Sequence, residues 1–132
     1  MYDAFWQFYQ DYDAAYQSKG DPGLQAMESD GAAFELRISM GIPRARMKLP
    51  VALEVKAPAA EAAVLAFAER HGFALDFRDD TWVITGEENA YYGRVRPNEV
   101  WFTPEKFADR RELLEELTSI YAAHGTPAAL QA

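Results

Sequence analysis

The sequence contains no cysteine, which removes disulfide bonds, thiol catalysis and thiolate metal sites from consideration. Histidine is also scarce: only His71 and His124 occur, and no HExxH spacing is present. Each histidine precedes a glycine at the expected end of a helix, where an imidazole can bond the free carbonyl groups. We therefore interpret both histidines as structural and expect no metal ion and no cofactor.

Motifs that hold phosphates or nucleophiles are missing as well. The eight glycines are scattered singly and form neither a GxGxxG motif nor a P-loop. No serine lies in the GxSxG context of a nucleophile elbow. The acidic pairs Asp79/Asp80 and Glu87/Glu88 fall in predicted turns, whereas general acid catalysis needs a buried or crowded carboxyl group. The sequence thus predicts no catalytic residue, and we expect that the protein is not an enzyme.

Positive charge is in the minority, with 13 basic against 21 acidic residues and a net charge of -8. Because nucleic-acid binding depends on neutralising phosphates, we expect no direct contact with nucleic acid. An acidic surface instead favours solubility or basic protein partners. No apolar run approaches the roughly 20 residues that span a bilayer, so no membrane association is expected. The acidic N-terminal stretch does not resemble a signal peptide, and we predict a cytoplasmic location.

The residues that are present suit an ordinary globular protein. The chain has 132 residues, of which 49% are hydrophobic and 26% charged. This length and balance predict a single domain over 1–132 that buries a sizeable core. Residues 2–18 carry an aromatic stripe at Phe5, Tyr9, Tyr12 and Tyr16, which indicates an N-terminal helix.

Further elements follow from periodicity and from glycine and proline signals. Helices are expected at 59–71 and 104–124, with a helical turn or two at 24–29. Strands are expected at 34–40, 51–56, 73–77, 81–85, 90–95 and 100–102, and residues 44–49 are predicted as an extended loop or edge. The order strand, helix, strand, strand, helix predicts an α+β fold, a ferredoxin-like sandwich with the N-terminal helix as an extension.

Three arginine or lysine side chains gather between two prolines and form the best candidate binding feature. Arg44, Arg46 and Lys48 lie within five positions of an otherwise acidic chain. Arginine bonds carboxylate or phosphate through a planar fork, so we predict that these residues contact a partner. The alternative is a solvated edge that discourages aggregation between sheets.

Aromatic residues supply two weaker candidates. Trp6 and Phe8 lie outside the main stripe of the N-terminal helix, which would fit a homodimer or partner face, although packing on its own domain is the favoured interpretation. A second set could stack nucleobases on a sheet face, but the net charge has the wrong sign and core packing is favoured. This second set comprises Trp82, Tyr91, Tyr92 and Trp101.

One family resemblance covers about residues 41–125. The start Gly41-Ile42-Pro43-Arg44, the strand Val51–Val55, the alanine-rich run Ala59–Leu75, the segment Thr81–Thr85 and a long final helix resemble the ribonuclease E inhibitor B family. The resemblance implies a ferredoxin-like fold and a non-catalytic protein that binds ribonuclease E and restrains RNA turnover. The strand at 34–40 and the aromatic N-terminal helix lie outside it.

The sequence as a whole favours a non-catalytic regulator that binds a protein partner, with ribonuclease E-type RNA turnover as the process that the resemblance implies. Two alternatives remain open at this point. One is an immunity or antitoxin-like acidic inhibitor that blocks a basic toxin. The other is a small enzyme of unrecognised family, which a deep pocket with a perturbed carboxyl group would favour.

Overall fold

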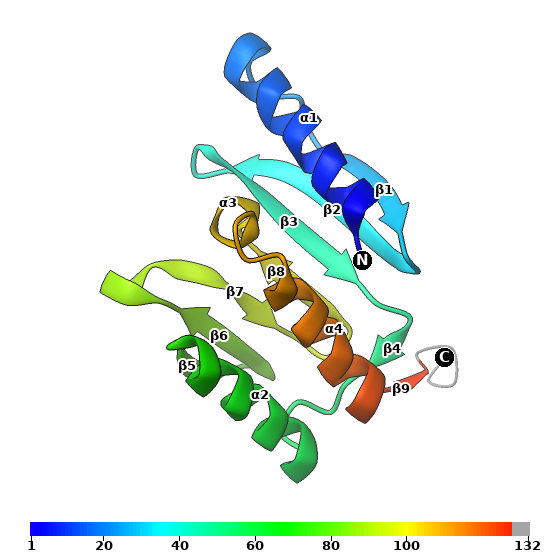
Figure 1. Ribbon diagram of the computed structural model, residues 1–132, viewed down its shortest axis with the longest axis vertical. Helices are drawn as coiled ribbons and strands as arrows, with labels where there is room; N and C mark the ends of the chain where they lie inside the picture. The colour runs from blue at the N-terminus through cyan, green and yellow to red at the C-terminus, as the bar shows by residue number, and fades with distance from the viewer. Residues whose placement is uncertain (128–132) are drawn as a thin grey trace.

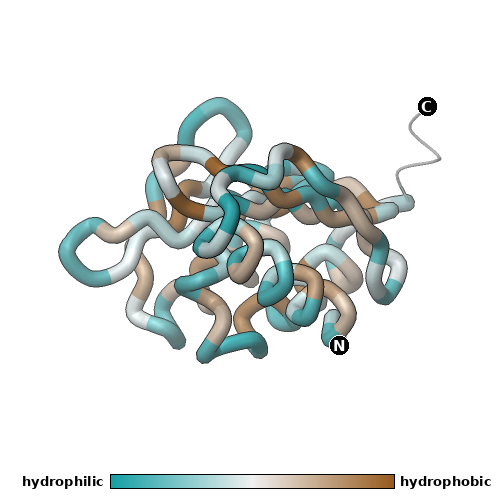
Figure 2. Tube along the Cα trace, turned by 90° about the horizontal axis from the view of Figure 1, so that it is seen from above, coloured by the Kyte–Doolittle hydropathy of each residue, from teal (hydrophilic) through white to brown (hydrophobic). Residues whose placement is uncertain are grey.

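The computed structural model describes residues 1–127 and has two layers, a seven-stranded sheet and a layer of helices on one of its faces (Figures 1 and 2). The helices are α1 (Asp3–Lys19), α2 (Pro58–His71), α3 (Pro104–Phe107) and α4 (Glu112–His124), with a short 3-10 turn at Glu87–Asn89. The main sheet consists of β1 (Gln25–Ser29), β2 (Ala32–Ser39), β3 (Ile42–Lys48), β5 (Ala74–Arg78), β6 (Thr81–Thr85), β7 (Tyr91–Val95) and β8 (Glu99–Phe102). A separate two-residue pair joins β4 (Val51–Ala52) to β9 (Thr126–Pro127).

The α+β class is confirmed, but the topology does not confirm the ferredoxin-like arrangement. The strand order is β1-β2-β3-β8-β7-β6-β5, and every described pair is antiparallel. A ferredoxin-like sheet contains a parallel pair joined through a crossover helix. Here α2 instead carries the chain to the far edge at β5, and three hairpins bring it back until β8 lies beside β3.

Strand β2 shows why one face of the sheet is buried. Its burial alternates residue by residue, with Ala32, Phe34 and Leu36 inside and their neighbours outside. Since strand side chains point to opposite faces in turn, this alternation places one face against the helices and the other in solvent. The sequence prediction of a strand at 34–40 is confirmed.

The prediction for residues 44–49 as a loop or edge is wrong, because β3 is an internal strand. It pairs with β2 on one side and with β8 on the other. Ala45 and Met47 are buried in the core, while Arg44 and Arg46 alternate with them on the solvent face. Pro43 lies before the first residue that pairs with β8, where a missing amide hydrogen does not break that ladder.

Residues 24–29 form a strand and not the expected helical turn. Six residues between glycine-containing breakers are too few for a stable isolated helix. Pairing with β2 satisfies the backbone of β1 instead, and Met27 lies opposite Phe34. The connecting turn uses Asp30 and Gly31, both with positive φ angles, which suits a tight hairpin.

Helix α1 is an integral part of the core. Phe5 is fully buried and its ring stacks on that of Phe34 with centroids 4.2 Å apart. Trp6 and Tyr12 are also buried, and Tyr9 is half-buried. Because Trp6 is used inside, the aromatic excess of this helix packs on its own domain, as the favoured interpretation holds.

Helices α2 and α4 cover the other half of the sheet and pack on each other. The predicted core residues Phe67, Leu113, Leu117 and Ile120 are all buried, which confirms the predicted apolar faces. Gly72 ends α2 in the left-handed conformation, and its N–H bonds the carbonyl groups of Ala68 and Glu69.

The final helix is interrupted, whereas the sequence predicted one helix over 104–124. It consists of α3 and α4, with i to i+3 hydrogen bonds from Arg110 to Phe107 and from Leu113 to Arg110 between them. The ring of Phe107 stacks on that of Phe102 in the sheet, with centroids 5.4 Å apart. The turn changes the direction of the chain, so the leucines of α4 also lie in the core. The predicted strand over 51–56 is likewise shorter and forms only β4, although Leu53 and Val55 are buried.

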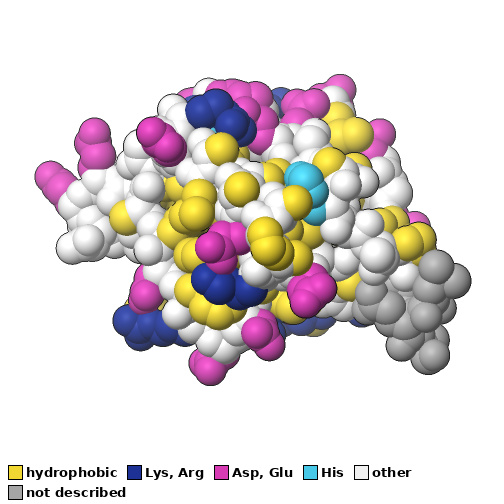
Figure 3. Space-filling model, turned by 90° about the horizontal axis from the view of Figure 1, so that it is seen from below, with side chains coloured by type: hydrophobic (Ala, Val, Ile, Leu, Met, Phe, Trp, Pro, Cys, Tyr) yellow, Lys and Arg dark blue, Asp and Glu magenta, His cyan; other side chains and the backbone are white. Residues whose placement is uncertain are grey.

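Within residues 1–127, no helix has the length and apolar character needed to cross a membrane. Seen from below, the end of the molecule where α2 lies in Figure 1 carries acidic side chains scattered among apolar and neutral ones (Figure 3). The acidic surplus of the sequence is thus spread over this surface and not gathered into one patch.

Candidate functional site

The helix-free face of the sheet, called the open face below, carries a row of side chains that crosses six strands. Cross-strand partners are, in order, Glu35, Arg46, Trp101, Arg94, Val83 and Asp76. Side chains directly opposite one another on a sheet lie about 4.5–5.5 Å apart at Cβ and interact. The row therefore brings together arginines and an indole that are far apart in the sequence.

A second pair of neighbouring side chains on the open face lowers the stability of the sheet. Arg37 of β2 lies directly opposite Arg44 of β3. Like charges in this position destabilise a strand pair. Arg37 reaches only the carboxylate of Glu35, at 3.9 Å, and Arg44 has no carboxylate within ion-pair distance in the described part of the chain. A local cost without local compensation is typical of a functional surface.

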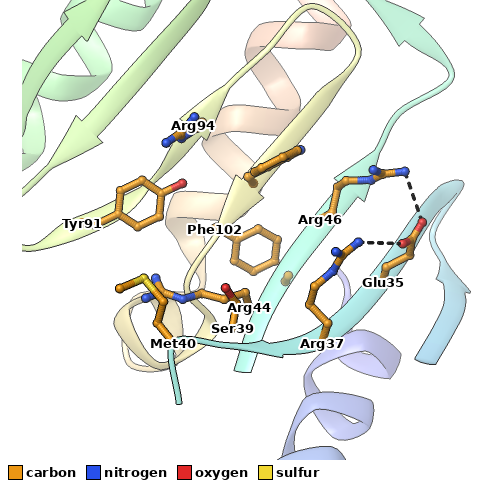
Figure 4. A pocket seen from close by; sticks show the side chains of 11 residues that line it. Glu35, Arg37, Ser39, Met40, Arg44, Arg46, Tyr91, Arg94 and Phe102 are labelled. Atoms are coloured by element: carbon orange, nitrogen blue, oxygen red, sulfur yellow. Dashed lines mark hydrogen bonds and ion pairs between the residues drawn. The ribbon is translucent and has the colours of Figure 1, made fainter. Parts of the chain in front are cut away.

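Tyr91 lies between two guanidinium groups. The Cζ atom of Arg44 is 5.5 Å from the centre of its ring and that of Arg94 is 5.7 Å away (Figure 4). Arg94 also lies 5.9 Å from the ring centre of Trp101. Cation–π contacts explain how the two cations are held in place, but they leave both positive charges without an ionic partner among residues 1–127.

A hollow of about 700 Å³ opens where β8 ends. Phe102 is the last residue of β8 that pairs with both neighbours, whereas β3 and β7 extend past it on either side. Arg44 and Tyr91 flank this point, and Arg44 Nη1 donates a hydrogen bond of 2.7 Å to Thr103 Oγ1. The hollow is lined by Glu35, Arg37, Ser39, Met40, Arg44, Ala45, Arg46, Tyr91, Arg94, Trp101 and Phe102.

The rim of the hollow includes a methionine in an unfavourable place. Met40 is 92% exposed and has a φ angle of 54° in the β2–β3 turn. Asparagine followed by glycine is the favoured pair in such a hairpin turn. Gly41 does follow, and its carbonyl accepts a hydrogen bond of 2.9 Å from the Tyr16 hydroxyl, which ties the turn to α1. Exposed methionines recur on surfaces that bind varied partners.

Two of the three predicted partner-contacting residues line this hollow. Arg44 and Arg46 both do, but Arg46 is paired with Glu35 at 3.2 Å and with Glu99 at 3.1 Å. Lys48 shares the open face and is exposed, yet it lies opposite Glu99 and outside the hollow. Among residues 1–127, neither Arg44 nor Lys48 has a carboxylate within ion-pair distance, and of these two only Arg44 lines the hollow.

Sequence reasoning missed Arg37 and Arg94, and it placed Tyr91 and Trp101 in the core. That interpretation holds for Trp82, which is 7% exposed, and Tyr92 packs against Phe73 at 4.8 Å. Trp101 alternates with the buried Val100 and Phe102, so strict two-residue periodicity would have placed it outside. Tyr91 escapes this rule because a register shift interrupts the β6–β7 pairing at Ile84 and Thr85.

Two buried donors on the open face have no hydrogen-bond partner in the described part of the chain. They are Arg94 Nε and Trp101 Nε1, which belong to directly opposed residues. A buried polar atom left without a partner costs about 1–3 kcal/mol. Both unpartnered donors therefore lie beneath the accessible surface of the open face.

His71 takes part in a side-chain cluster between two helices. His71 Nε2 bonds the carboxylate of Glu116 on α4, and Arg110 Nη2 donates to its Nδ1 at 3.0 Å. Both ring nitrogens are therefore occupied, and the imidazole links α2 to α4. The expected bond to free carbonyl groups at the helix end is replaced by this side-chain pair, because Gly72 already caps the helix. Among residues 1–127, no three His, Cys, Asp or Glu side chains converge in a way that could hold a metal ion.

Burial raises the pKa of tyrosine hydroxyl groups in this protein. Burial raises the pKa of Tyr9 to about 12, with the carboxylates of Asp13 and Glu105 adding to the effect. Burial also raises the pKa of Tyr121, whose hydroxyl donates to the carbonyl of Arg96. Both hydroxyls stay protonated at neutral pH, and that of Tyr121 acts as a structural donor.

Comparison of the chain with protein-family profiles, with characterised proteins and with solved structures finds no match.

Proposed function

We propose that this protein is a non-catalytic regulator that binds an acidic segment of a protein partner on the open face of its sheet. The observation that carries the proposal is the pair Arg44 and Arg94, which share the ring of Tyr91 and have no carboxylate partner among residues 1–127. Complementary charge across an interface steers association and selects partners. Acidic residues outnumber basic ones in this chain, so two arginines that flank one ring without a carboxylate partner favour an acidic group on another molecule.

A protein partner is favoured over nucleic acid. The net charge of -8 opposes a polyanion as a whole, and acidic side chains interrupt the open face at Glu35, Glu99 and Asp76. A phosphate backbone needs a continuous basic track. Met40 and Trp101 add apolar surface beside the charges, and aromatic residues, methionine and arginine are the types enriched at protein interfaces.

We include restraint of ribonuclease E-type RNA turnover in this proposal only because residues 41–125 resemble the ribonuclease E inhibitor B family. The immunity-like alternative requires a surface that attracts a basic toxin. The distinctive surface here is cationic, with four arginines and one acid lining the hollow, and therefore favours an acidic partner instead. A homodimer through α1 is less favoured, because Phe5, Trp6 and Tyr12 are already buried in their own chain.

The test uses a partner captured from the native host with the full chain as bait, then purified and titrated against variants at two ionic strengths. Arg44→Ala combined with Arg94→Ala should weaken binding at least about tenfold and flatten its salt dependence, since screened charges carry the contact. The matched control removes two exposed cations away from the open face, Lys19→Ala with Arg70→Ala. Equal affinity of the open-face variant and wild type at both ionic strengths refutes the proposal.

A further inference from the structure

We infer that the hollow beside Tyr91 is a carboxylate-binding subsite that receives an aspartate or glutamate side chain of the partner, next to an apolar side chain. The inference rests on the proposed function, because it assigns the chemistry that the open face recognises. It concerns a single position within that face, the end of β8, where Arg44 and Arg94 approach one ring.

The donors available at this position suit a carboxylate. A guanidinium carries five N–H groups, and Arg44 uses Nη1 on Thr103. Arg94 makes no side-chain hydrogen bond among residues 1–127; its Nε is buried, which leaves its two Nη groups as the donors for a ligand. Arginine binds carboxylates through two parallel hydrogen bonds, which are stronger than those between neutral groups. An anion beside Tyr91 would be attracted by both positive charges and would relieve the repulsion between Arg37 and Arg44.

The surroundings of the two arginines define what flanks the carboxylate. Met40 stands at one rim, and Trp101 lies opposite both Arg46 and Arg94. Both side chains present apolar surface, and tryptophan is often a dominant contact in protein interfaces. A volume of about 700 Å³ lies within the roughly 300–1,000 Å³ of small-ligand sites and accommodates a few side chains. An acidic residue with an aromatic neighbour fits these walls.

A singly charged carboxylate is favoured over a phosphate. Both are oxyanions that arginine recognises. The hollow contains the carboxylate of Glu35, and the whole protein carries a net charge of -8. Repulsion from these negative charges grows with the charge of the ligand, so it opposes a dianion more than a monoanion.

The test is calorimetric titration of the full chain with a capped tripeptide of phenylalanine, glutamate and phenylalanine. Its glutamine and phosphoserine analogues are titrated in parallel. Arg44→Gln and Arg94→Gln keep side-chain polarity and remove the charge. The matched control is Arg78→Gln, which removes an arginine paired with Asp76 at the far edge of the same face.

The glutamate peptide should bind at least about tenfold more tightly than the glutamine peptide, because hydrogen bonds between charged groups are stronger than those between neutral ones. Arg44→Gln and Arg94→Gln should each remove about that tenfold preference, and Arg78→Gln should leave it within about twofold. Absence of binding, equal binding of the glutamine peptide, or an equal loss in Arg78→Gln overturns the inference. Tighter binding of the phosphoserine peptide assigns the hollow to phosphate and also overturns it.

The two proposals fail in distinguishable ways. If the peptides bind without regard to Arg44 and Arg94 while the captured partner still depends on both, the subsite is wrong and the proposed function stands. If the captured partner ignores both arginines, the proposed function itself is wrong.

Discussion

Replacing Phe5 with alanine tests whether α1 belongs to the folded core. The Phe5 ring is 0% exposed and contacts three other aromatic rings. It stacks on Phe34 at 4.2 Å and meets Trp6 and Phe102 edge-on at 5.1 and 5.6 Å. A Phe→Ala change in a core costs about 3–5 kcal/mol. Each aromatic pair adds roughly 0.5–1.5 kcal/mol beyond burial, so we expect the upper part of that range.

This loss is large for a chain of this size. Domains unfold with about 5–15 kcal/mol, so Phe5→Ala should remove about a quarter or more of the total. At roughly 2–4 °C per kcal/mol, the melting temperature should fall by about 8–20 °C. Phe8→Ala is the matched control, because Phe8 lies on the same helix, is only half-buried and makes one tilted contact with Tyr12 at 6.5 Å. It should cost about 1 kcal/mol.

Urea unfolding followed by circular dichroism measures both variants. A shift of the midpoint with an unchanged slope identifies a change in stability alone. The cost of Phe5→Ala should not depend on protein concentration, since the contacts are intramolecular; a dependence would indicate that α1 docks across a dimer. A loss below about 1 kcal/mol, or one equal to that of Phe8→Ala, contradicts the packing of α1 described above.

Three further predictions concern other parts of the molecule. Met40→Asn should stabilise the fold by a few tenths of a kcal/mol up to about 1 kcal/mol, since asparagine tolerates a positive φ angle. The same substitution should weaken the affinity for the partner. Unchanged affinity would exclude Met40 from the interface. Gly93→Ala should destabilise by about 1–3 kcal/mol in thermal melts, because the added Cβ would lie 2.3 Å from the carbonyl oxygen of Trp101. The free energy of unfolding should fall above about pH 10. There the unfolded chain loses its tyrosine protons, whereas the folded chain keeps those of Tyr121, whose pKa is raised, and of Tyr9, whose pKa is about 12. The folded state then binds more protons than the unfolded state, so a rise in pH favours unfolding. Tyrosinate absorbance that rises fully before the circular dichroism signal is lost would contradict this order.

Local patterns in the sequence predict most of the elements but not their neighbours. The aromatic stripe of α1, the alternation of β2 and the glycine after α2 each follow from periodicity within a few residues. The internal position of β3 does not, because its arginines, alanine and proline have little strand preference. Its strand conformation comes from pairing with β2 and with β8, the latter more than 50 residues later in the sequence.

The candidate site could be predicted only in part, because local patterns do not show which strands lie next to each other. The clustering of Arg44 and Arg46 in the sequence pointed to this surface, since charge density is visible along the chain. Arg94 and Tyr91 join them only through the strand order, which places β7 near β3 across the end of β8. Nor did the sequence distinguish Arg46, whose charge is satisfied by Glu35 and Glu99, from Arg44, whose charge is not.

Because side chains alternate along β3, every second residue packs in the core and the residues between them face solvent. Ala45 and Met47 are held by the core, so most replacements there cost folding free energy. Arg44 and Arg46 lie half-buried on the solvent face, where substitutions usually cost less folding free energy than in the core. Specificity can therefore change through every second residue of this strand while the scaffold stays the same, which gives a lineage of such proteins a route to new partners in single steps.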